Sequence, residues 1–65
     1  MEPIDLLAAP LGEYKVEAFC ATKPGRRWWP GTLVGRTREE NPRFDVVLDD
    51  RTVLSGLTAE QLRVA

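Results

Sequence analysis

The chain is 65 residues long, with 43% hydrophobic residues, 29% charged residues and a net charge of −1. This length fits one small globular domain, whose thin core buries about 60% of the unfolded chain's surface. The lack of histidine and the single cysteine, Cys20, exclude an internal disulfide, histidine-based catalysis and most zinc sites. We therefore expect neither an enzyme nor a cofactor, and no apolar run approaches the about 20 residues that span a bilayer.

The N-terminal part of the sequence predicts a short helix followed by a strand. Residues 1–12 form an apolar lead-in, in which a helix would end at Pro10 and Gly12. Residues 14–21 then alternate with a period of two, which is typical of a strand with one buried face.

The next segment predicts a turn and a curved second strand. Residues 22–27 contain a Pro-Gly pair, which favours a turn, and residues 28–36 follow as a strand. Pro30 lacks a backbone donor, so we expect it at an edge or a bend. Gly31 and Gly35 indicate strong curvature within this strand.

The C-terminal part predicts two further strands and one helical turn. Residues 44–48 form a third strand, and a tight turn at residues 49–51 leads into a fourth strand at residues 52–54. Thr58 is a candidate helix N-cap, and Gln61, three residues later, completes a capping box. This helix has room for one turn before the last strand of the chain.

Short strands separated by turns predict an all-β fold, and the chain is too short for a two-sheet sandwich. We expect a small five-stranded barrel over residues 13–65, with residues 1–12 as an apolar extension. Strand parity directs these side chains inward: Tyr14, Val16, Ala18, Trp29, Leu33, Phe44, Val46 and Leu48, with Leu57 and Leu62 completing the core. It directs these outward: Phe19, Trp28, Pro30, Val34 and Val47.

The outward pair Phe19 and Trp28 is a predicted interaction surface, because large exposed apolar groups usually mark a contact. We expect residues 4–8 to cover this pair, in the same chain or in a partner's. The alternatives are a protein partner or a weak homodimer in place of a monomer.

Several short motifs follow one another along the chain: Val16-Glu-Ala, Trp28-Trp-Pro-Gly-Thr-Leu-Val, Phe44-Asp-Val-Val-Leu-Asp-Asp, Leu57 and Leu62-Arg63. Together they resemble the Tudor domains, a family of SH3-like barrels. The Trp-Trp-Pro-Gly run is also similar to the signature of the related PWWP domains. The resemblance covers residues 13–64 and implies an SH3-like barrel that binds methylated lysine or arginine in an aromatic cage.

The resemblance also implies a ligand site at the mouth of the barrel. The positions that correspond to the cage hold Cys20, Trp29, Leu48, Asp50 and Thr52. Trp29 matches a cage aromatic and Asp50 matches the acid that pairs with the methylated cation, whereas the other three positions are not aromatic. Arg51 stands where the family usually has glycine. The cage is thus degenerate.

Our hypothesis is a non-enzymatic module that binds a peptide or protein partner, including a methylated one. The alternative is nucleic-acid binding, because the segment from residue 23 to residue 38 holds five cations and no anion. Its contacts would be Lys23, Arg26, Arg27, Arg36 and Arg38, with Trp28 or Trp29 stacking on a base. A simpler explanation is a solvated loop, and the net charge near zero argues against a dedicated nucleic-acid binder. We expect an intracellular protein, nuclear in a eukaryote and otherwise cytoplasmic.

Overall fold

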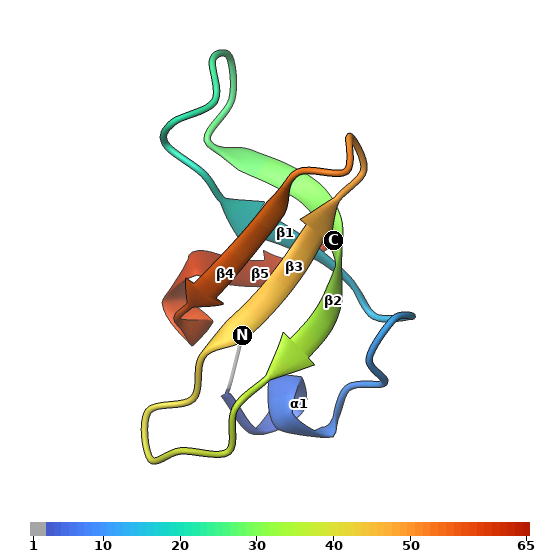
Figure 1. The fold of residues 1–65 in the computed structure, drawn as a ribbon, viewed down its shortest axis with the longest axis vertical. Coiled ribbons are helices and arrows are strands. Elements are labelled where there is room, and N and C mark those ends of the chain that lie inside the picture. The colour runs from blue at the N-terminus through green and yellow to red at the C-terminus, as the bar shows by residue number, and fades with distance from the viewer. Residues whose placement is uncertain (1–2) are drawn as a thin grey trace.

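A computed structural model describes the backbone of residues 3–65 and the side chains of residues 6–65. The elements are α1 (Pro3–Ala8), β1 (Lys15–Phe19), β2 (Trp28–Arg36), β3 (Phe44–Leu48), β4 (Val53–Leu57), the 3-10 turn η1 (Ala59–Gln61) and β5 (Leu62–Val64). The strands form one antiparallel sheet in the order β4-β3-β2-β1-β5, which curls on itself (Figure 1). The predicted small all-β fold, with one helical turn before the last strand, is confirmed, and it is compatible with an SH3-like barrel.

The central strand β2 has the predicted bounds and the predicted curvature. Its pairing with β3 begins at Gly31, one residue after Pro30, so the missing donor of Pro30 does not interrupt this ladder. A Cβ atom at Gly31 would lie 2.7 Å from the carbonyl oxygen of Val47, so glycine allows the two strands to approach closely. The register shifts between Leu33 and Gly35, where an extra residue bends the strand.

The fourth strand is longer than its sequence predicts. We expected it to end at Leu54, before a Ser-Gly break, but β4 continues to Leu57. Gly56 has a φ of 71°, and the β3–β4 register shifts at this point, so the glycine lies in a bulge within the strand. The backbone N–H of Gly56 donates a hydrogen bond to the Asp45 carboxylate at 3.2 Å, which satisfies the group that the bulge frees.

The core lies inside the curled sheet and confirms the predicted parity. The buried members of the predicted inward set are Val16, Ala18, Leu33, Phe44, Val46, Leu48, Leu57 and Leu62. Tyr14 and Trp29 are partly buried and pack against this cluster. The capping box is also present, because the Thr58 backbone N–H donates to the Gln61 side-chain oxygen at 2.9 Å.

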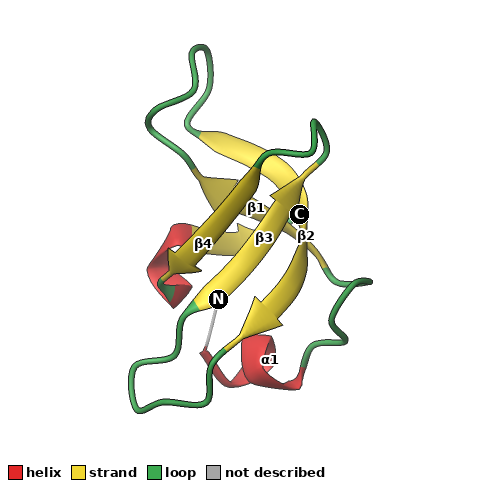
Figure 2. Ribbon diagram, in the orientation of Figure 1, coloured by secondary structure: helices red, strands yellow, loops and turns green. Residues whose placement is uncertain are grey.

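The N-terminal segment closes one end of the barrel. The helix α1 lies beside the C-terminal end of β2, whereas the loop between β1 and β2 projects from the other end of the sheet (Figure 2). Leu6 is fully buried and joins the core together with Ala9. The Arg36 guanidinium donates hydrogen bonds to the carbonyl oxygens of both residues, at 2.9 Å for Leu6. Burial of apolar side chains and the hydrogen bonds from the Arg36 guanidinium thus hold the N-terminal segment in place.

This position corrects our expectation that residues 4–8 cover Phe19 and Trp28. That prediction is wrong for Leu6, and the side chain of Ile4 lies outside the described residues. The physical reason is that an uncovered barrel end would leave core side chains in contact with water. Burying Leu6 there removes the apolar surface of Leu6 and of those core side chains from water.

The outward pair is covered by other means. The rings of Phe19 and Trp28 pack on one another with centroids 5.6 Å apart. The Arg63 guanidinium lies 4.3 Å from the centroid of the Trp28 ring, and its Nε donates to the Glu17 carboxylate at 2.8 Å. Both aromatic side chains are therefore partly shielded within the chain itself.

Candidate functional site

The mouth of the barrel, opposite α1, is formed by the turn between β3 and β4 and the loop between β1 and β2. In the turn, the Leu48 N–H donates to the Thr52 carbonyl oxygen and the Arg51 N–H donates to the Leu48 carbonyl oxygen, both at 2.8 Å. The Asp50 carboxylate accepts the Thr52 N–H at 3.0 Å. Arg51 has a φ of 72°, in the left-handed region that favours glycine. The turn therefore places a residue other than glycine in the left-handed conformation.

The loop between β1 and β2 is closed at its base by one backbone hydrogen bond and by one hydrogen bond from a side chain. The Cys20 N–H donates to the Arg27 carbonyl oxygen at 2.8 Å. The indole Nε1–H of Trp29 donates to the Arg26 carbonyl oxygen, also at 2.8 Å. Gly25, with a φ of 98°, turns the chain at the tip. This arrangement brings the loop over the Trp29 ring.

The side chain of Lys23 crosses from this loop into the mouth. Its Nζ lies 4.9 Å from the centroid of the Trp29 ring. The same Nζ forms an ion pair with the Asp50 carboxylate and donates to the Thr52 hydroxyl at 3.4 Å. Three of the predicted mouth residues therefore surround one ammonium group, and this group belongs to the chain itself.

The hydrogen bond from Lys23 lowers the pKa of the Asp50 carboxyl from 3.8 to about 2. The hydroxyl and the backbone N–H of Thr52 add to this effect. Each of these donors favours the charged form of the carboxyl over the neutral form. Asp50 is consequently anionic at neutral pH and supplies the negative charge of the mouth.

The other two predicted mouth residues contribute little surface. Leu48 is buried in the core, and Cys20 is buried beneath the loop. The Cys20 thiol is 3.3 Å from the Thr22 hydroxyl, and this hydrogen bond lowers the thiol pKa. The cation site therefore consists of Trp29, Asp50 and Thr52.

The five predicted nucleic-acid contacts do not share one surface. Lys23 is paired with Asp50, and the Arg26 guanidinium lies 5.1 Å from the Trp29 ring centroid at the mouth. Arg36 stands at the far end of β2, where it holds the N-terminal segment. Arg27 and Arg38 are exposed, at opposite ends of the same strand.

Sequence reasoning missed the place of Lys23 in the mouth. We had grouped it with the basic residues of its segment because linear charge patterns do not reveal partners. The available signal was the position of Lys23 in the loop between the first two strands. That loop and the Asp-Asp turn between the third and fourth strands lie at the same end of the barrel.

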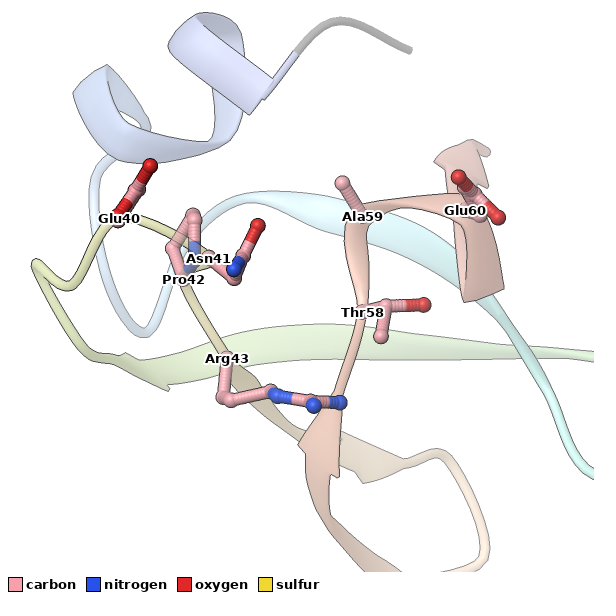
Figure 3. Close-up of a pocket in the computed structure, with 7 residues that line it drawn as sticks. All are labelled: Glu40, Asn41, Pro42, Arg43, Thr58, Ala59 and Glu60. Carbon is pink, nitrogen blue, oxygen red and sulfur yellow. The ribbon is translucent and has the colours of Figure 1, made fainter.

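A hollow of about 530 Å³ lies away from the mouth, between η1 and the loop that joins β2 to β3. It is lined by Glu40, Asn41, Pro42, Arg43, Thr58, Ala59 and Glu60 (Figure 3). The two glutamates stand on opposite sides of the hollow, and the Arg43 guanidinium reaches across it to the Gly56 carbonyl oxygen at 3.4 Å. Its polar groups therefore do not converge on one point.

No family model, no curated protein and no solved structure gives a significant match to this chain. Among the described side chains, those of residues 6–65, no group of three or more Cys, Asp and Glu residues is suited to a metal ion. Within residues 3–65, no helix has the length and apolar character needed to cross a lipid bilayer.

Proposed function

We propose that this chain is a non-enzymatic binding module that takes a lysine or arginine side chain of a peptide or protein partner at the barrel mouth. The observation that carries the proposal is the position of the Lys23 ammonium, between an aromatic face, a carboxylate and a hydroxyl. A cation from another chain would find the same three contacts there. The resemblance to the Tudor family supports the same class of ligand.

The composition of the site favours a ligand with few or no methyl groups. Trp29 is its one aromatic ring, so the attraction between ring and cation is smaller than in a complete aromatic cage. Asp50 and Thr52 both accept hydrogen bonds from the ammonium that occupies the site. Because trimethyl-lysine has no N–H to donate, we expect it to bind more weakly than about 1 mM.

A peptide titration tests this function. We would titrate the ¹⁵N-labelled protein with three versions of one glycine-flanked pentapeptide, whose central residue is lysine, trimethyl-lysine or uncharged norleucine. The lysine peptide should shift the Trp29 indole N–H resonance most. In a Lys23→Gln background, where Asp50 has no ion pair with a lysine of the chain itself, Asp50→Asn should weaken binding of the lysine peptide about two- to fivefold, as expected for one partly exposed charge pair. Glu39→Gln, which removes an equal charge elsewhere, should leave it unchanged.

The proposal fails if the norleucine peptide binds as well as the lysine peptide, or if Asp50→Asn has no effect in the Lys23→Gln background. A parallel titration with a short single-stranded oligonucleotide tests the nucleic-acid hypothesis. If the oligonucleotide binds with a steep salt dependence and the lysine peptide does not bind, the nucleic-acid function replaces the one proposed here.

A further inference from the structure

The mouth of the barrel already contains a cationic side chain of its own. The side chain of Lys23 is 21% exposed, whereas that of Asp50 is 48% exposed, so the lysine is the better buried member of the pair. Its ammonium makes the contacts expected of a bound lysine: an aromatic face, a carboxylate and a hydroxyl. The site is therefore filled in the free protein.

The loop that carries Lys23 makes this occupation possible. Hydrogen bonds from Cys20 and Trp29 fix the base of the loop, so the lysine starts close to the ring that it covers. Its flexible stem of four carbons reaches the turn between β3 and β4 without a change in the backbone. A charge pair as exposed as this one contributes little to folding, so the side chain can leave without unfolding the barrel.

We propose that Lys23 is a tethered competitor, which occupies the cation site in the free protein and leaves when a partner's cationic side chain enters. This inference rests on the function proposed above. A competitor on a short tether has an effective concentration in the millimolar range. It lowers the apparent affinity of the partner in proportion to the fraction of molecules whose site is open. Only partners that add contacts beyond a single lysine would then bind well.

The decisive experiment removes the competitor and supplies a free cation. The probe is n-butylammonium chloride, titrated at constant ionic strength against potassium chloride, with the Trp29 indole N–H resonance as the readout. Lys23→Gln should bind the probe about tenfold more tightly than the original protein, as expected if the site is open about one-tenth of the time. Lys15→Gln removes the same charge from an exposed position on β1 and should behave like the original protein.

A second variant tests whether substitution at position 23 acts by altering the loop instead of by removing the cation. Lys23→Arg keeps a cation on the tether and should behave like the original protein, and thermal melting of all variants establishes that they are folded. Equal affinity of the original protein and Lys23→Gln for n-butylammonium would overturn the proposal, as would tighter binding by Lys15→Gln.

The lysine pentapeptide then separates this inference from the proposed function. If Lys23→Gln binds n-butylammonium more tightly but neither protein binds the peptide, the competitor is real and the proposed function is wrong. If the original protein binds the peptide as tightly as Lys23→Gln does, the proposed function stands and the competitor does not. If neither protein binds either probe, both proposals are overturned.

Discussion

The two ends of the barrel are closed by different physical means. At one end, α1 inserts the fully buried Leu6 into the core, and the Arg36 guanidinium donates hydrogen bonds to the carbonyl oxygens of Leu6 and Ala9. At the other end, Lys23 spans the mouth to an aspartate that is 48% exposed. Apolar burial involves no protonation and is not weakened by ionic screening, whereas an exposed ion pair is screened by salt and exchanges readily. The first closure suits a permanent part of the fold, and the second suits a site that opens.

The largest expected effect is at the α1 end. Leu6→Ala should lower the free energy of unfolding by about 2–5 kcal/mol, because it leaves a cavity in the core. A domain of this size holds about 3–10 kcal/mol in total, so the variant should be close to unfolding. Urea denaturation followed by tryptophan fluorescence measures the change. Leu11→Ala, at a side chain that is 45% exposed, is the control, and equal midpoints for the two variants would show that α1 is not part of the core.

The hydrogen bonds from Arg36 give the next largest effect. Arg36→Met removes two charge-assisted hydrogen bonds and should cost about 1–3 kcal/mol. Amide hydrogen exchange should also increase in residues 6–9, which lose their anchor. Arg38→Met, at an exposed position on the same side of the domain, should leave both measurements unchanged. A stable Arg36→Met protein with unaltered exchange would mean that Leu6 alone holds the segment.

At the mouth, a substitution in the turn should stabilise the protein. Arg51 has a φ of 72°, a conformation that costs an L-residue about 1–2 kcal/mol and that glycine adopts freely. Glycine also has more freedom in the unfolded chain, so we expect Arg51→Gly to gain at most about 1 kcal/mol. Arg51→Ala keeps the Cβ atom and should give no gain. A lower melting temperature for Arg51→Gly would indicate that the arginine side chain itself stabilises the turn.

The smallest effect is expected for Asp50→Asn and should depend on pH. Because folding lowers the pKa of Asp50 from 3.8 to about 2, its contribution to stability is fully present above about pH 4. This contribution is lost as the pH falls toward 2, where the folded protein also binds the proton. Asp50→Asn should therefore flatten the dependence of the melting temperature on pH between 4 and 2 and leave its shape above pH 5 unchanged. An unaltered acid limb would show that the ion pair does not form in solution.

The sequence by itself determined the elements whose cause is local. The bounds of β2 and β3, the inward parity and the capping box at Thr58 all match the predictions. Each of these depends on residues within a few positions of one another, through side-chain period or turn chemistry. The predicted end of β4 was wrong because its cause is not local. Gly56 is compatible with a strand break and with a bulge, and only the pairing with β3 decides between them.

The tertiary structure alone decided how the two ends of the barrel are closed. Arg36 binds the carbonyl oxygen of Leu6 across 30 positions of sequence, and Lys23 meets Asp50 across 27. Neither pairing leaves a periodic pattern in the sequence. Each partner is a single residue that lies in a loop, in a turn or at the end of a strand. Which loop meets which turn depends on the curl of the whole sheet. For this reason the sequence indicated Trp29, Asp50 and Thr52, which surround the ammonium group, but it did not indicate that the ammonium belongs to Lys23.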